Sequence, residues 1–395
     1  MTQTKNYRIE SIDLLRGVVM VIMALDHVRD YFHFGSFYID PTDLATTTPL
    51  LFFTRWITHF CAPVFVFLAG TSAFLYASRR ETRGEVARFL LTRGLWLIFL
   101  EITVVNFAWT FDATLSLHIL QVIWAIGISM VVLSGLIFLP RYALLAIGIL
   151  FVGAHNLLDA FTAQGLSPQS IAWYLLHQQQ LSVLGKGIAI FFAYPVIPWI
   201  GLMILGYLFG TFYQKGYDAA ERKKWLLRLG LGAIALFIVL RSGNFYGDLV
   251  PWQPRETLGY SIISFFNTTK YPPSLAFLLM TIGPALLFLY ATENIKNRVS
   301  DALVTIGRVP LFYYVIHLYV VHLLAIFGVL YAGRHWADMV LTAKAFMSAN
   351  LANYGYNLAV VYLVWGSVVL ALYPLCKRYN AYKAANRDKW WLSYL

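Results

Sequence analysis

Long apolar runs, each separated from the next by a polar stretch, dominate the chain of 395 residues. A helix needs about 20 residues to cross about 30 Å of hydrocarbon, and ten runs approach that length. They lie at residues 11–33, 55–77, 89–109, 117–139, 142–161, 189–213, 226–241, 272–291, 309–331 and 356–376. The pattern predicts an all-α bundle of about ten transmembrane helices that forms a single domain over residues 1–395.

Basic residues occur in every second connection between these runs. Lys and Arg precede the first run and follow the second, fourth, sixth, eighth and tenth, whereas the other connections are poor in both. Cytoplasmic connections of membrane proteins carry an excess of Lys and Arg. The pattern therefore predicts that both termini lie in the cytoplasm. It also explains the net charge of +11 by topology rather than by nucleic-acid binding.

The composition limits the chemistry that the chain can carry. With 59% hydrophobic and 12% charged residues, it is an integral membrane protein and not a soluble one. None of the nine histidines falls in a predicted cytoplasmic segment, so acid–base chemistry is expected in the outer half. Histidines also bind metals, but no His-x-x-x-His or Cys-x-x-Cys spacing occurs. The sequence therefore predicts no metal site.

The first run carries ionisable residues that are costly in hydrocarbon. On a helix with about 100° per residue, one stripe holds Asp13, Arg16, Met20, Met23, His27 and Asp30. Because a charged group at mid-bilayer costs roughly 2.5 to 3.5 kcal/mol, we expect the stripe to face a cavity. Asp30 is spaced to orient the His27 imidazole, and Asp26 to pair with Arg29. The alternative is that these residues only cap the helix at the interface.

Polar residues elsewhere in the outer half are candidates for contact with a substrate. They are His59, His118, Gln121 and His317. We expect His118 and Gln121, three residues apart, on one helix face, where a local hydrogen-bonded pair is an equally good explanation. The same alternative applies to His155 and Asp159, four residues apart.

Two pairs of prolines interrupt the later runs. Pro195 and Pro198 open the sixth run, and Pro272 and Pro273 open the eighth. Broken helices are tolerated at membrane depth where the freed backbone groups face protein or water. The breaks predict an internal vestibule.

Several long stretches resemble the bacterial branch of the heparan-alpha-glucosaminide N-acetyltransferase catalytic-domain family, nearly from end to end. They include "SIDLLRGVVMVIMALDH", "HFCAPVFVFLAGTSAFL", "YPVIPWIGLMILGYLFG" and "GRVPLFYYVIHLYVVHLLA". The wider superfamily of membrane acyltransferases has a similar opening, with an Arg three residues and a His fourteen residues after an Asp. Asp13, Arg16 and His27 fit that spacing.

The resemblance implies a multi-pass acyltransferase of the bacterial inner membrane. Cytoplasmic acetyl-CoA would supply an acetyl group to an amino or hydroxyl group of a sugar or glycan on the outer side. His27 would accept the proton, beside Asp26 and Asp30, and the donor would lie near Arg16, Asp13, Arg88 and Arg93. A transporter or flippase of a small anionic or lipid-linked compound and an inactive binding protein are the alternatives. The acceptor and the oligomeric state stay open, with a homodimer as one option.

Overall fold

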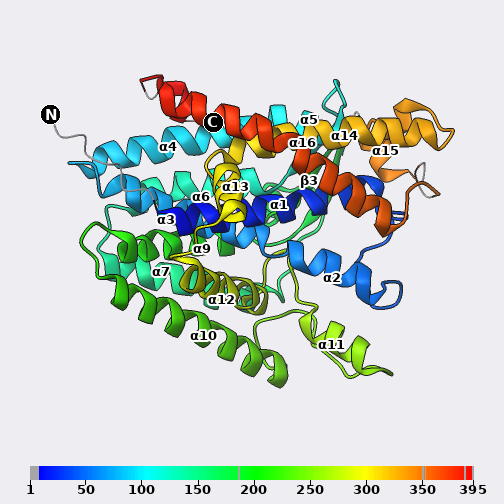
Figure 1. Cartoon of the computed structure of the whole chain (residues 1–395). Coiled ribbons are helices and arrows are strands. Elements are labelled where there is room, and N and C mark those ends of the chain that lie inside the picture. The colour runs from blue at the N-terminus through cyan, green and yellow to red at the C-terminus, as the bar shows by residue number, and fades with distance from the viewer. Residues whose placement is uncertain (1–8, 186, 349–350, 352, 387, 394–395) are drawn as a thin grey trace.

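The computed structural model describes residues 9–185, 187–348, 351, 353–386 and 388–393. Most of them lie in helices that run roughly side by side along the long axis of the molecule (Figure 1). The central helix α1 (Glu10–Phe32) begins, and the last long helix α16 (Leu358–Ala385) ends, at the same end of the bundle. The side of the membrane on which this end lies stays a prediction.

Each of the ten apolar runs contains a helix. Besides α1 and α16, these helices are α3 (Cys61–Ala77), α4 (Arg83–Leu100), α6 (Val122–Leu136), α7 (Arg141–Gly153), α9 (Ile197–Phe209), α10 (Ala219–Gly243), α12 (Leu275–Thr292) and α14 (Pro310–Tyr331). Within the described residues, six helical segments are long and apolar enough to cross a membrane: Pro49–Ala77, Arg83–Thr110, Ala219–Gly243, Leu275–Thr292, Pro310–Tyr331 and Leu358–Ala385. The chain is therefore a multi-pass membrane protein, and the count of ten spans stays a prediction.

Shorter elements connect these helices. They are the helices α2 (Pro49–Thr58), α5 (Asn106–Thr110), α8 (Pro168–Leu176), α11 (Leu258–Phe266), α13 (Arg298–Gly307) and α15 (Ala343–Met347), the π-helical turn Glu101–Val105, and the 3-10 turns His155–Leu158, Gly210–Tyr213, Trp336–Met339 and Trp390–Ser393.

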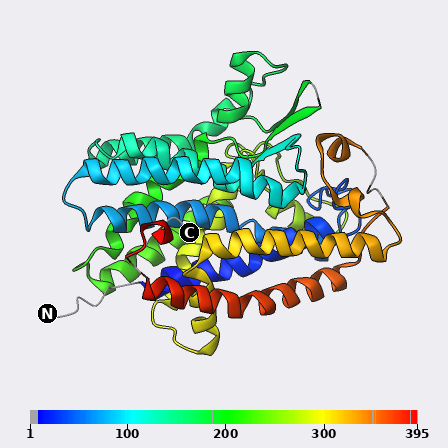
Figure 2. The ribbon, with the colours of Figure 1, turned by 90° about the horizontal axis from the view of Figure 1, so that it is seen from above.

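A three-stranded sheet departs from the all-α prediction. Strand β1 (Leu117–Leu120) pairs in parallel with β3 (Ile188–Phe192), which pairs antiparallel with β2 (Gln180–Gly185). The fourth and sixth apolar runs thus begin as strands and only later become helices. Periodicity cannot distinguish a short buried strand from a helical segment in an uninterrupted apolar run. In Figure 2, α8 and the β2–β3 hairpin, both coloured green, stand out from the helices.

Close backbone contact fixes the orientation of α1. A Cβ atom at Gly17 would lie 1.9 Å from the carbonyl oxygen of Leu303 in α13, and one at Gly307 would lie 1.9 Å from that of Asp13. A side chain at either glycine would therefore force α1 and α13 apart. The helix α1 also packs against α3, α14 and α16, and its residues Asp13, Asp26 and Arg29 are buried.

A buried carboxylate sets the start of α6. Glu101 is fully buried in the π-helical turn. Its Oε1 accepts from the Gln121 N–H at 3.2 Å and its Oε2 from the Trp124 N–H at 3.1 Å. These N–H groups lie at the amino end of a helix, where a negative charge is stabilising. The contact fixes where β1 gives way to α6.

Candidate active site

His27 of α1 makes a buried contact with a second histidine. His27 is 8% exposed, and its Nδ1 lies 2.6 Å from Nε2 of His317 in α14. The two rings are stacked, with centroids 4.9 Å apart. The Nδ1 of His317 lies 2.9 Å from the carbonyl oxygen of Tyr313.

The direction of this hydrogen-bond chain assigns the tautomer of each ring. A carbonyl oxygen only accepts, so Nδ1 of His317 carries its proton and donates to Tyr313. The Nε2 of His317 is then an acceptor, and Nδ1 of His27 donates to it. Among the described residues no hydrogen bond is made to Nε2 of His27. That nitrogen therefore holds a lone pair, which is what a general base needs.

The His27 imidazole lines a cavity of about 80 Å³, which we call the His27 cavity. Trp109 stands edge-on to the imidazole, with ring centroids 4.8 Å apart. The other walls combine apolar, acidic and basic side chains from several elements. The lining residues are Met23, Asp26, Asp30, Arg55, Thr58, Cys61, Ala62, Phe65, Trp109, Gln121, Val122, Tyr194, Lys270 and Tyr271.

Ion pairs hold the carboxylates of this cavity. Asp26 accepts from Arg55 of α2 at 2.5 and 2.7 Å and pairs with Arg29 at 2.9 Å. The predicted Asp26–Arg29 pair is therefore confirmed. Asp30 also pairs with Arg29, at 2.5 Å, and His317 occupies the imidazole nitrogen that we expected Asp30 to hold. The expected contact between Asp30 and His27 is therefore wrong, although Asp30 lines the same cavity.

Both basic residues of the His27 cavity, and Tyr271 beside one of them, were absent from the sequence prediction. Arg55 is the single charge in an apolar stretch, and Lys270 and Tyr271 come directly before the proline pair that predicted a vestibule. The Nζ of Lys270 lies 5.1 Å from the centroid of the Tyr271 ring. Burial alone would raise the pKa of the Tyr271 phenol, but Lys270 and Arg55 outweigh it and lower that pKa.

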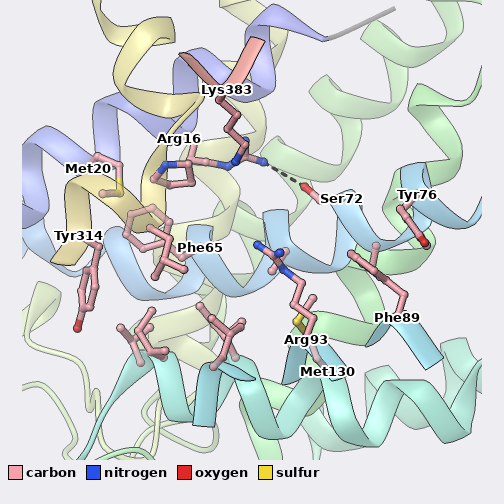
Figure 3. A pocket seen from close by; sticks show the side chains of 18 residues that line it. Arg16, Met20, Phe65, Ser72, Tyr76, Phe89, Arg93, Met130, Tyr314 and Lys383 are labelled. Atoms are coloured by element: carbon pink, nitrogen blue, oxygen red, sulfur yellow. Dashed lines mark hydrogen bonds between the residues drawn. The ribbon is translucent and has the colours of Figure 1, made fainter. Parts of the chain in front are cut away.

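A larger cavity of about 370 Å³ adjoins the His27 cavity on one side and shares Phe65 and Val122 with it. We call it the Arg16 cavity. Most of its walls are apolar, but Arg16, Arg93 and Lys383 enter it from α1, α4 and α16 (Figure 3). Arg16 donates to Asp13 at 3.0 Å and to the Ser72 hydroxyl at 3.1 Å.

A third cavity, of about 260 Å³, shares Arg55, Lys270 and Tyr271 with the His27 cavity. We call it the His59 cavity. Its lining is more polar and includes Asp40, Thr42, His59, Gln179, Asn267, Thr268 and Thr269. Three adjoining cavities therefore form a row with His27 in the middle one.

The predicted stripe on α1 faces this row. Arg16 and Met20 line the Arg16 cavity, and Met23, His27 and Asp30 line the His27 cavity. Asp13 is buried and pairs with Arg16 and, at 3.5 Å, with Arg308. It is therefore connected to the Arg16 cavity through Arg16 and does not line it.

The remaining predicted residues separate into those on the row and those away from it. His59 lines the His59 cavity and Gln121 the His27 cavity. His118 lies in strand β1, so the expectation that His118 and Gln121 share a helix face is wrong. Arg93 lines the Arg16 cavity, whereas Arg88 is exposed and lies outside its lining.

Comparison with known families finds one match. The family model described as "Heparan-alpha-glucosaminide N-acetyltransferase, catalytic" matches residues 8–246, which is more than half of the chain. The matched segment runs from the start of α1 past the end of α10, and it includes His27 and most of the Arg16 cavity. The comparison with curated protein sequences finds no match.

Proposed function

The chain belongs to the heparan-alpha-glucosaminide N-acetyltransferase catalytic family, and we propose that it transfers an acetyl group from acetyl-CoA to a sugar across the membrane. The observation that carries this proposal is the lone pair of His27 Nε2 in the middle of three adjoining cavities. A base in that position reaches a donor from one side and an acceptor from the other.

The Arg16 cavity is the proposed donor site. Acetyl-CoA combines anionic phosphates with a long, uncharged arm that ends in the thioester. The apolar walls suit the arm, and the guanidinium groups of Arg16 and Arg93 together with Lys383 suit the phosphates. The sequence prediction that the basic connections, and with them the end of the bundle where α1 begins, are cytoplasmic supports this assignment.

The His59 cavity is the proposed acceptor site. A sugar needs several hydrogen-bond donors and acceptors around its hydroxyl groups. The side chains of Asp40, Thr42, Gln179 and Asn267 supply both kinds. The Arg55, Lys270 and Tyr271 side chains, which line both this cavity and that of His27, would lie between the sugar and the thioester.

The proposed reaction is a direct acyl transfer. The amino or hydroxyl group of the sugar attacks the thioester carbonyl as Nε2 of His27 takes its proton, so that a C–N or C–O bond forms. The C–S bond then breaks, and the coenzyme A thiolate receives the proton from Nε2. Throughout, Nδ1 of His27 donates to His317, which keeps the ring in place.

Sidedness in proteoliposomes tests this function. Acetyl-CoA labelled in the acetyl group is supplied on one face and a panel of amino and neutral sugars on the other. We expect labelled sugar, and we expect transfer to depend on the face to which the donor is added. A transporter would instead carry labelled donor or sugar across unchanged.

Replacing His27 with alanine connects the activity to the base. We expect His27→Ala to lower transfer by about 10²- to 10⁴-fold, the usual contribution of a general base. His335→Ala is the matched control, since this histidine lies in a loop and its Nδ1 only accepts from the Ala337 N–H. Equal rates in wild type and His27→Ala would overturn the proposed function.

A further inference from the structure

A second group of ionisable side chains lies apart from the row of cavities. His155 begins the 3-10 turn that follows α7, Asp159 directly follows that turn, and His177 directly follows α8. One potential ligand atom from each residue lies within 4.8 Å of the other two. None of the three lines the Arg16, His27 or His59 cavity.

The hydrogen bonds of this group are incomplete. His177 donates from Nε2 to Oδ1 of Asp159 at 2.9 Å. His155 is 2% exposed, yet neither of its ring nitrogens has a hydrogen-bond partner among the described residues, and Nδ1 of His177 also has none. Because buried polar atoms are normally paired, two free nitrogens on one buried ring call for a ligand. His155 and His177 meet edge to face, with centroids 5.5 Å apart.

We propose that His155, Asp159 and His177 bind a divalent metal ion and that Zn²⁺ fits this ligand set best. Two imidazole nitrogens and one carboxylate oxygen are typical zinc ligands, and three protein ligands leave one position for water. The ion would displace the proton that His177 now shares with Asp159. The proposal departs from the sequence prediction of no metal site, which rested on local spacing.

The neighbour of the carboxylate supports this assignment. Asn156 donates from Nδ2 to Oδ2 of Asp159 at 2.8 Å, which orients the carboxylate and leaves Oδ1 toward the histidines. The Oδ1 of Asn156 accepts from the Leu275 N–H at 3.0 Å, at the start of α12. Outer-shell partners of this kind hold metal ligands in place.

The position of the site indicates a structural role. It joins the turn after α7 to the end of α8, which leads directly into the sheet, and through Asn156 it is linked to α12. Of these elements, α8 and the β2–β3 hairpin form the part of the molecule that stands out in Figure 2. An ion here would hold this part against the helices without taking part in acyl transfer.

Metal titration of the purified, full-length protein tests the proposal. The protein is stripped with a chelator, incubated with Zn²⁺ or Co²⁺ and desalted, and bound metal is measured by mass spectrometry. We expect a single ion per chain and, for Co²⁺, the visible absorption of a four-coordinate site. His155→Ala and His177→Ala should each weaken binding by at least about tenfold, and Asp159→Asn should do so while keeping the shape of the side chain.

His335→Ala is the matched control for this titration, because it removes an imidazole that caps the Trp336–Met339 turn and lies outside the proposed metal site. It should bind metal as the wild type does. Stripped wild type that takes up no ion would overturn the proposal, whatever the variants do. Equal binding by wild type and the double variant His155→Ala/His177→Ala would overturn it as well.

Discussion

Two buried histidine pairs in this protein differ in how their hydrogen bonds end. In the His27–His317 pair, a chain of donors ends on a backbone carbonyl and leaves a single lone pair, on Nε2 of His27. In the His155–His177 pair, the only hydrogen bond runs to Asp159, and three ring nitrogens have no partner in the described structure. Because burial is similar in both, the hydrogen-bond partners of each imidazole must account for the different chemistry expected of the two pairs.

The surroundings of the two pairs differ in the same sense. His27 lines a cavity that shares lining residues with two further cavities, which is the arrangement that the proposed acyl transfer requires. His155 and His177 converge on a carboxylate instead, and the ligand atoms lie so close together that a single ion would fill the space. The first arrangement suits proton transfer and the second suits coordination.

The largest expected effect is on acetyl transfer. Measuring both transfer and bound metal in the same variants separates the roles of the two histidine pairs. His27→Ala should lose about 10²- to 10⁴-fold in acetyl transfer and keep its metal. His155→Ala should keep transfer within about twofold and lose metal, since it touches none of the three cavities. Rates with labelled acetyl-CoA and metal content by mass spectrometry are taken from one preparation. Loss of both properties in either variant would show that the two pairs form one functional unit.

The next effect concerns His317 as a positioning residue. His317→Leu removes the acceptor for Nδ1 of His27, so the imidazolium formed during transfer loses a hydrogen bond worth about 1.5 to 3 kcal/mol. We expect kcat to fall roughly tenfold to a hundredfold with little change in KM for acetyl-CoA.

His317→Gln is the conservative partner of that variant, because its side-chain oxygen still accepts a hydrogen bond. It should recover most of the lost kcat. A merely structural role for His317 predicts no such recovery. If the leucine and glutamine variants were equally slow, the assigned tautomers would be wrong.

The sequence was sufficient to predict the position of His27 but not its partner. Charged residues in an apolar run are costly, so the stripe on α1 had to face a cavity, and it does. His317 lies 290 residues away, and only the packing of α14 on α1 brings the rings together. The local candidate, Asp30, was chosen by spacing, but it pairs with Arg29 instead.

The other misses have similar causes. Strands β1 and β3 pair across a long separation in sequence, and apolar composition alone did not distinguish them from helix starts. The spacing of His155 and Asp159 was visible, whereas His177 joins them through the fold of α8. Arg55 was overlooked because its partner Asp26 lies on another helix. In each case the local sequence contains one partner of a contact, and the fold brings in the other from a distant segment.

A smaller effect is expected on thermal stability, and it tests metal binding by the His155–His177 pair. A ligand that binds only the folded state at roughly ten times its Kd stabilises that state by about 1.4 kcal/mol. Zn²⁺ should therefore raise the melting temperature of the stripped wild type and of His27→Ala by the same few degrees, as followed by intrinsic fluorescence. His155→Ala should show less than a third of that stabilisation at the same Zn²⁺ concentration. A rise of equal size in His155→Ala would place the ion elsewhere.

The smallest expected effect is on KM for acetyl-CoA. It distinguishes two arginines of α4 and tests whether the donor binds beside the His27–His317 pair. Arg93 lines the Arg16 cavity, whereas Arg88, five residues earlier on the same helix, is exposed outside that lining. Removing one partly screened contact to a phosphate costs about 1 kcal/mol, so Arg93→Ala should raise KM for acetyl-CoA roughly fivefold. Neither kcat nor KM for the sugar should change, because the chemistry occurs at His27.

Arg88→Ala is the control for net charge and should leave all three constants as they are. Equal increases in both variants would mean that the basic end of the bundle attracts the donor only through its overall charge and that the Arg16 cavity does not hold it.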